Sequence, residues 1–260
     1  GHNKVFFGSF DGNFYAVDFD NGRREWRFET SAPIHSSPAV DGSIVYFGGY
    51  DRVVYALSVI DGTLVWAAPT GAEIESSPAV AGEHLFIGSN DGYLYALDRL
   101  TGKRQWRVNT GGPVKSTPAI VDDTVYIASE SGTVMAITIA DGEVQWEFDA
   151  GSAISYSSPA VENNTVVVGT EDGNIFGIRA DNGRERWRVE AGAEVRASAT
   201  IVNRVVYIGS YDESLYAIAL NTGDLLWSTD RGAVVGSPIF ADGTIFVSLS
   251  TGELQALRPG

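Results

Sequence analysis

Short apolar runs separated by polar turn residues recur along the whole chain. Four of them, VYFGG, LFIGS, VYIAS and VVVGT, occupy residues 45–49, 85–89, 125–129 and 166–170. Their successive apolar residues are typical of strands whose two faces are both covered. Tight turns related to Ser-x-Asp-Gly follow these runs, and Asp-Gly turns favour β-hairpins because glycine tolerates a positive φ. The pattern therefore predicts an all-β protein.

Tryptophan marks an internal repeat. The six tryptophans stand at 26, 66, 106, 146, 187 and 227, so their spacing is 40 or 41 residues. One unit is clearest in residues 84–120, where four short β-rich segments follow one another. We call its strands A (the Ser-Pro segment), B (the apolar run), C (the segment after the Asp-Gly turn) and D (the tryptophan segment). Four short antiparallel strands per ~40 residues are typical of a β-propeller blade.

The composition of strands A and D predicts their places in a blade. Because proline cannot donate a backbone hydrogen bond, a strand that repeatedly contains it is expected at an edge. Strand A carries this proline as Pro38, Pro78, Pro118, Pro159 and Pro238. Charged residues surround the tryptophan of strand D, for example in REWRFE (24–29), and such charges protect an exposed edge from pairing. We therefore expect strand A to line the central channel and strand D to form the rim.

At this point the repeat resembles a known family. Segments 16–26 (AVDFDNGRREW) and 96–106 (ALDRLTGKRQW) are similar to the tryptophan-docking repeat of pyrroloquinoline-quinone-type propellers. The resemblance implies that each tryptophan packs against the neighbouring blade. The docking residues would be Trp26, Trp66, Trp106, Trp146, Trp187 and Trp227. Several copies depart from the motif and are expected to differ in local hydrogen bonds, namely at Ser58, Thr138, Arg179, Ala219 and Gly177.

The order of the strands predicts how many blades there are. The chain opens on a B strand (KVFFGS) and ends after a C strand (ELQALRPG), which makes five complete blades between two three-stranded ones. We expect a seven-bladed propeller, with a truncated eight-bladed propeller as the alternative. Residues 1–3 are interpreted as a tag remnant, and residues 4–260 as one propeller domain of about 6.5 repeats of ~40 residues.

Composition narrows the possible partners. The formal net charge is −15, and so acidic a surface repels nucleic acid and anionic membranes. No apolar run approaches the ~18 residues that span a bilayer, so we expect no direct membrane insertion. The chain contains no cysteine, which excludes disulfides and thiolate metal sites. The family resemblance implies an extracytoplasmic location, periplasmic or extracellular, with a possible anchor in the native full-length protein.

Candidate catalytic chemistry is sparse. The quinoprotein dehydrogenases of the resembled family use a vicinal cysteine pair beside their cofactor, and this sequence cannot supply one. Three histidines, His2, His35 and His84, are too scattered to indicate a zinc site or a catalytic triad. The aspartates of the Ser-x-Asp-Gly turns are interpreted as caps of their own turn backbone, namely Asp11, Asp51, Asp91, Asp172 and Asp212. We expect no catalytic residue, no metal and no cofactor.

Variation between the repeats points to one face. The A–B and C–D turns are monotonous, whereas the residue before the Ser pair changes in every copy and the second residue of the B–C turn varies among Phe, Tyr, Asn and Glu in the first six copies. The D–A and B–C loops leave a blade on the same side, and binding sites tend to lie on loops that a rigid scaffold holds. The candidate binding residues are His35, Glu75, Lys115, Tyr156, Arg196, Phe10, Tyr50, Asn90, Glu130, Glu171 and Tyr211, with Val235 at the last copy. The alternative is unselected drift, with mixed charges that pair across the mouth.

Three classes of function remain open. The favoured reading is a non-enzymatic propeller that binds a protein partner or a small ligand through the D–A/B–C face. A relative, the lipoprotein scaffold of the outer-membrane β-barrel assembly machinery, works as such a scaffold or assembly factor. The second class is the extracytoplasmic sensor domain of a membrane-bound kinase. The third, a quinoprotein dehydrogenase, is disfavoured.

Overall fold

The computed structural model describes residues 3–230 and 236–258. Its contacts divide the chain into two compact units, one of residues 1–120 and 139–142, the other of residues 121–138 and 143–260. Each unit is described by itself, and strand β12 (Ala119–Val121) lies at the boundary between them. The prediction of one domain over residues 4–260 stays a prediction.

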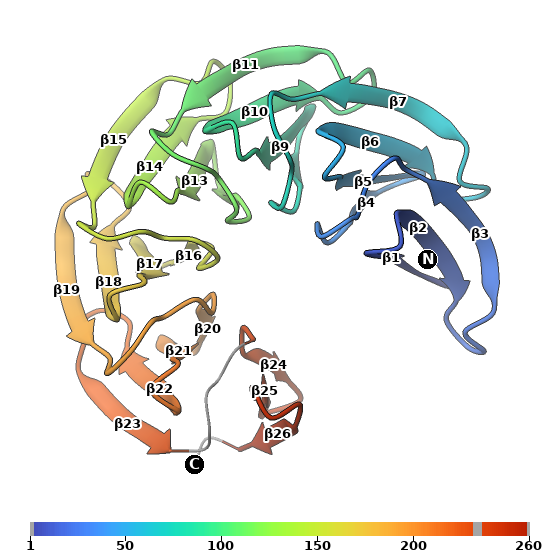
Figure 1. The fold of residues 1–260 in the computed structure, drawn as a ribbon. Coiled ribbons are helices and arrows are strands. Elements are labelled where there is room, and N and C mark those ends of the chain that lie inside the picture. The colour runs from blue at the N-terminus through green and yellow to red at the C-terminus, as the bar shows by residue number, and fades with distance from the viewer. Residues whose placement is uncertain (1–2, 231–235, 259–260) are drawn as a thin grey trace. The chain divides into compact units, whose positions relative to one another are not determined.

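The described residues contain 26 strands in seven antiparallel sheets and no helix, which confirms the all-β fold with one sheet per predicted blade (Figure 1). The A strands are β4 (Ala39–Asp41), β8 (Ala79–Ala81), β12, β16 (Ala160–Glu162), β20 (Thr200–Val202) and β24 (Ile239–Ala241). The B strands are β1 (Lys4–Gly8), β5 (Ile44–Gly48), β9 (His84–Gly88), β13 (Thr124–Ala128), β17 (Thr165–Gly169), β21 (Val205–Gly209) and β25 (Thr244–Ser248).

The C and D strands complete the sheets. The C strands are β2 (Asn13–Asp18), β6 (Val53–Ser58), β10 (Tyr93–Asp98), β14 (Thr133–Thr138), β18 (Asn174–Arg179), β22 (Ser214–Ala219) and β26 (Leu254–Leu257). The D strands are β3 (Arg24–Glu29), β7 (Leu64–Pro69), β11 (Arg104–Asn109), β15 (Val144–Asp149), β19 (Glu185–Glu190) and β23 (Leu225–Asp230). In the described part of the chain, five sheets have four strands, the first lacks strand A and the last lacks strand D. The predicted strand count is confirmed.

The A strands are shorter than the sequence predicts. Each contains three residues, and all but β20 begin directly after the proline, so that Ser36, Ser37 and Pro38 precede β4 rather than belong to it. The reason is physical: proline has no N–H to donate, and the Ser side chains take up backbone bonds instead. Ser36 Oγ accepts the N–H of Gly48 at 3.2 Å, and Ser37 N–H donates to Ser77 Oγ in the next repeat at 3.0 Å.

The hydrophobic core of each unit lies between successive sheets. The B strands β5, β9, β13, β17 and β21 are buried on both faces, as the apolar runs predict; Val45, Tyr46 and Phe47 of β5 are 0% exposed. In β1, by contrast, Val5 and Phe7 are 42% and 41% exposed. In the first unit one cluster joins Tyr46 and Trp66 of one sheet to residues such as Leu85 of the next. This packing explains why a B strand cannot alternate with polar residues. No helix of the described residues has the length and apolar character to cross a membrane.

Every described tryptophan-to-turn contact has the same form. Five of the indoles lie against the C–D turn of the next sheet and donate Nε1–H to a backbone carbonyl there. The pairs are Trp26–Val59 (3.2 Å), Trp66–Arg99 (3.0 Å), Trp106–Ile139 (2.9 Å), Trp146–Ala180 (2.8 Å) and Trp187–Leu220 (2.7 Å). Glycine is required at position 62 for two reasons: its φ is +72°, and a Cβ there would lie 2.5 Å from the Trp26 ring. The C–D turns therefore seat the indoles, beyond the turn chemistry that their sequence indicates.

One departure from the repeat motif has a structural reason. The residue opposite the tryptophan on strand C is alanine in five copies and Gly177 in the sixth. A Cβ on Gly177 would lie 2.1 Å from the ring of Trp187. The ring therefore occupies the space that the alanine methyl group takes in the other copies.

Candidate functional site

The variable position before the Ser pair lies between two buried neighbours. Ile34 is buried, His35 is exposed and Ser36 is buried again, which is the alternation of an extended chain. The apolar anchor fits because the B strand ends in glycine: a Cβ on Gly8 would lie 2.1 Å from Ile34 Cγ2. The same anchor recurs in the other copies as Ile74, Val114, Ile154 and Val195.

Backbone hydrogen bonds hold the D–A loop around Ile34 between the B–C turns of two successive sheets. Ile34 N–H donates to Ser9 O of the preceding sheet at 3.1 Å, and Tyr50 N–H of the following turn donates to Pro33 O at 3.0 Å. The same two bonds recur around Val195, from Val195 N–H to Thr170 O at 2.9 Å and from Tyr211 N–H to Glu194 O at 2.9 Å. A variable D–A residue is thereby placed between two variable B–C residues.

The first group of candidate residues is aromatic. His35 lies between Phe10 and Tyr50, with ring centroids 5.8 and 6.3 Å away. Phe10 and Tyr50 are themselves 6.5 Å apart in an edge-to-face arrangement. Phe10 is 68% exposed, so this group presents apolar surface to solvent.

The second group is polar and largely buried. Asn90 Nδ2 donates to Glu75 Oε1 at 3.0 Å, and Lys115 Nζ lies 3.6 Å from the same oxygen. The side chains of Glu75 and Lys115 are only 10% and 19% exposed. This group satisfies its own charges.

The third group joins charge to an aromatic ring. Arg196 Nη2 lies 3.5 Å from Glu171 Oε1, its Nε lies 2.9 Å from Glu194 Oε2, and its guanidinium stands 5.6 Å from the centre of the Tyr211 ring. The guanidinium is placed for a cation–π contact with Tyr211.

The single 41-residue spacing has its extra residue at this loop. Ile154 is followed by Ser155 and Tyr156 before the conserved Ser157, where the other copies have one residue. Ser155 is buried and donates to Glu171 Oε1 at 2.6 Å, whereas Tyr156 is 37% exposed. Glu130 lies half-buried on the β13–β14 turn, and Val235 lies outside the described residues. Nine of the sequence-predicted residues thus fall into three local groups of three.

The turn aspartates do more than the predicted capping. Asp91 Oδ1 accepts the N–H of Tyr93 at 3.1 Å, as a cap does, but its Oδ2 accepts the Tyr95 hydroxyl at 2.5 Å and the Gly71 N–H of the preceding sheet's D–A loop at 2.7 Å. Asp212 repeats this with Tyr216 (2.5 Å) and Gly192 (2.7 Å). We call this arrangement, in which one aspartate binds its turn, a tyrosine hydroxyl and the preceding D–A loop, the latch. The Asp-x-x-x-Tyr spacing in the sequence was the signal for it, and sequence reasoning missed that signal.

The latch perturbs the ionisation of its members. Burial would raise the pKa of Asp212, but hydrogen bonds from the Tyr216 hydroxyl and from the N–H groups of Gly192 and Ser214 outweigh it and lower the pKa. Burial, together with the hydrogen bond to Asp212, raises the pKa of Tyr216 to about 12. The carboxylate is therefore held charged and the phenol neutral at physiological pH.

Among the copies whose preceding D–A loop is fully described, two lack this latch and use a local substitute. The turn has Ser131 in place of the aspartate in one copy, and Asp172 faces Phe176 instead of tyrosine in another. In the D–A loops before them, the N–H of Gly111 bonds to Asn109 Oδ1 at 2.9 Å and that of Gly151 to Asp149 Oδ1 at 2.8 Å. Each of the five D–A loops that the structure describes in full is thus fixed by a carboxylate or amide oxygen.

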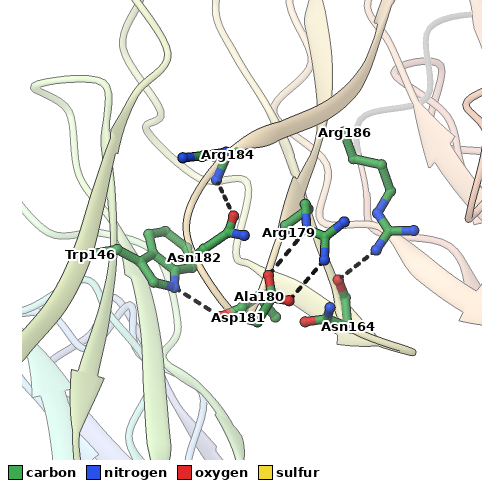
Figure 2. Close-up of polar contacts among 8 residues, drawn as sticks. All are labelled: Trp146, Asn164, Arg179, Ala180, Asp181, Asn182, Arg184 and Arg186. Carbon is green, nitrogen blue, oxygen red and sulfur yellow. Dashed lines mark hydrogen bonds and ion pairs between the residues drawn. The ribbon is translucent and has the colours of Figure 1, made fainter.

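Two pockets differ in position. One, of about 260 Å³, lies on the D–A/B–C side of the first unit among Asn90, Asp91, Gly92, Asn109 and 111–113. The other, of about 320 Å³, lies on the A–B/C–D side of the second unit, where Asn164, Ala180 and Asp181 border it (Figure 2). Among the described residues, no group of three or more His, Cys, Asp or Glu side chains is placed to hold a metal ion.

Solved structures share the fold of this chain. A search of curated proteins finds no match. The crystal structure of BamB from Moraxella catarrhalis superposes with a TM-score of 0.83 at 18% identity, over 98% of this chain and 81% of that chain. The computationally designed protein Ika8 superposes with a TM-score of 0.70 at 18% identity, over 99% of this chain and 93% of that chain. At these identities the two structures share the fold with this chain.

The family relationship comes from the sequence itself. The family model described as outer membrane protein assembly factor BamB matches residues 1–77 and 51–260, which together span the chain. The matched residues include the repeats, the seven antiparallel sheets and the indole contacts between sheets. The chain therefore belongs to the pyrroloquinoline-quinone-type β-propeller family of outer membrane protein assembly factor BamB.

Proposed function

We propose that this protein is a non-enzymatic scaffold that binds a protein partner through the face formed by its D–A and B–C loops. The observation that carries the proposal is the exposed aromatic and arginine content of that face. Phe10, Tyr156 and Tyr211 are 68%, 37% and 38% exposed, and Arg196 stands beside Tyr211. Tyrosine and arginine are enriched among the residues that dominate protein–protein binding energy.

The rigidity of the loops supports the same proposal. Four of the described D–A loops, around Ile34, Ile74, Ile154 and Val195, are bonded to B–C turns on both sides, and a carboxylate oxygen fixes each of them again. A loop that is already ordered loses little conformational entropy when it binds. The recess of about 260 Å³ on this side is small and rich in glycine, which suits a partner's backbone better than a large cofactor.

The family description supports the remaining parts of the proposal. It names an assembly factor of the outer membrane, which favours a scaffold without catalytic chemistry and an extracytoplasmic location. A small ligand on the same face is the alternative occupant. We propose no metal and no cofactor for this face.

The test replaces three tyrosines on the face, Tyr50, Tyr156 and Tyr211, by serine and measures partner capture from an envelope extract of the source cells. We expect capture to fall at least about tenfold, because each lost aromatic contact costs about 1 kcal/mol or more. The melting temperature should stay within about 3 °C, since all three side chains are at the surface. Undiminished capture by a folded triple variant would refute the face assignment.

A further inference from the structure

A polar pocket lies between two sheets of the second unit, on the side opposite the D–A/B–C face. Its volume is about 320 Å³, and turns β12–β13, β16–β17 and β18–β19 surround it. Asp122, Glu162 and Asp181 line it together with the amides of Asn163 and Gln145, and no lysine, arginine or histidine is among its lining residues. The pocket is therefore acidic and rich in hydrogen-bond acceptors.

The repeat explains why the pocket exists. The Trp146 indole donates to the Ala180 carbonyl at 2.8 Å, just as the Trp66 indole donates to the Arg99 carbonyl at 3.0 Å, so Ala180 is the counterpart of Arg99. The other counterparts within the two units are larger than alanine, for example Val59 and Leu220, both of which are fully buried. At position 180, by contrast, the side chain that faces this gap between sheets is no larger than a methyl group.

The equivalent gap in the first unit is occupied by an arginine. The Arg99 guanidinium reaches back from its C–D turn and forms an ion pair with Asp41 at the end of the preceding A strand. Tyr46 forms the wall of that gap and donates its hydroxyl to the Arg99 carbonyl at 3.0 Å. One copy of the repeat thus already binds a guanidinium, that of Arg99, between two sheets.

In the second unit, the tyrosine of the corresponding wall does not bond to the carbonyl opposite it. Tyr126 stands where Tyr46 does and lines the pocket, yet no hydrogen bond joins its hydroxyl to the Ala180 carbonyl, both residues being in the described part of the chain. Burial raises the pKa of Tyr126, so its hydroxyl stays a neutral donor and acceptor at the pocket wall.

The charges at the pocket are only partly compensated. Arg179 binds Asp181 through Nε at 3.2 Å and Nη2 at 2.9 Å, and Arg186 is directed to the Asn164 carbonyl at 3.3 Å (Figure 2). Among the described residues, no cation lies within ion-pair distance of Asp122 or Glu162. Two carboxylates therefore remain for an incoming cation.

From these observations we propose that the pocket binds the side chain of an arginine that a protein partner presents. A guanidinium offers five N–H donors in one plane, which match two carboxylates and neighbouring amide oxygens better than an ammonium does. The partner's arginine would take the place that Arg99 takes in the first unit. This site lies on the A–B/C–D side, so the proposal does not depend on the one made for the D–A/B–C face.

The test uses isothermal titration of the full chain with Nα-acetyl-arginine amide and with its neutral isostere Nα-acetyl-citrulline amide. We expect saturable binding of the arginine probe and affinity about tenfold lower for citrulline, because charge-assisted hydrogen bonds contribute about 1.5–3 kcal/mol. Equal affinity for the two probes, or no saturable binding of arginine, would overturn the proposal.

Three variants locate the binding. Ala180→Arg should abolish probe binding because its own guanidinium fills the pocket, whereas Ala140→Arg on the neighbouring C–D turn has the same charge and should bind as the parent does. Asp122→Asn combined with Glu162→Gln keeps the shape and should weaken arginine binding about tenfold. If Ala180→Arg does not fold, the double variant decides, and its unchanged affinity would contradict the proposal.

Discussion

The Tyr216 hydroxyl donates a 2.5 Å hydrogen bond to Asp212 Oδ2, the same oxygen that accepts the Gly192 N–H from the preceding sheet. One carboxylate therefore joins a turn, a strand and the loop of a neighbouring blade. Asp91 and Tyr95 form the same arrangement in the first unit. The latch positions the D–A loop that carries the proposed interface.

Replacing the phenol should change the pH dependence of stability. The folded pKa of Tyr216 is about 12, above the value of 10.0 in an unfolded chain. A group with a raised pKa contributes stability below its unfolded pKa, and this contribution is lost between pH 10 and about 12. In Tyr216→Phe the free energy of unfolding should be about 1 kcal/mol lower at pH 7 and should fall less steeply above pH 10.

The measurement is urea unfolding at pH 7 and at several pH values above 10, with Tyr211→Phe on the same turn as the control. The control should retain the alkaline loss of the parent. A Tyr216→Phe profile parallel to that of the parent would show that the hydrogen bond to Asp212 does not hold the phenol neutral.

The carbonyl shared by Tyr46 and Trp66 should couple these two residues. Both donate to Arg99 O at 3.0 Å, so either single substitution leaves this part-buried carbonyl one of the two donors, and the double substitution leaves it neither. We expect Trp66→Phe and Tyr46→Phe each to cost about 1 kcal/mol, and the double variant to cost about 1 kcal/mol more than their sum. Thermal or urea unfolding of the four proteins of the cycle measures this; strict additivity would contradict the shared acceptor.

Gly177→Ala should destabilise the protein although alanine occupies this position in every other copy. The added methyl group would meet the Trp187 ring at 2.1 Å, and the indole is held by its bond to Leu220. Overpacking of this kind costs about 1–3 kcal/mol. The smaller ring of Trp187→Phe should relieve the clash, so Gly177→Ala should cost less in that background; an equal cost in both would exclude the ring as the cause.

Much of the fold was predictable because it depends on local patterns. Tryptophan spacing, proline in the A segment and Asp-Gly turns together predict seven sheets, their strand order and the incomplete first and last ones. The bounds of the A strands were not predictable, because Ser36 Oγ takes over a backbone bond that an A strand would otherwise accept from Gly48.

The site was less predictable than the fold. Variation at positions such as His35 and Arg196 indicated a face, but only coordinates show that His35 lies between two aromatic rings while Arg196 pairs with Glu171. The pocket beside Ala180 escaped sequence reasoning because the C–D turns look uniform. Its signal was the size of one side chain, since Arg99 and Ala180 differ within otherwise similar turns.

The charged groups of the proposed interface should contribute little to stability. Arg196 and Glu171 are more than one third exposed and 3.5 Å apart, and ion pairs of this kind contribute up to about 1 kcal/mol. Arg196→Ala should therefore lower the free energy of unfolding by no more than about 1 kcal/mol while it reduces partner capture. A loss above about 2 kcal/mol with unchanged capture would indicate a structural role instead.

The central claim is that the D–A/B–C face holds the partner, and two phenylalanines allow it to be tested with a matched control. Phe10 on a B–C turn and Phe19 on a C–D turn of the same sheet are each 68% exposed. A photo-crosslinking phenylalanine analogue is placed at one or the other position, and crosslinking to the partner is measured in the same envelope extract. The account predicts an adduct from position 10 and none from position 19. An adduct from position 19 alone would contradict it.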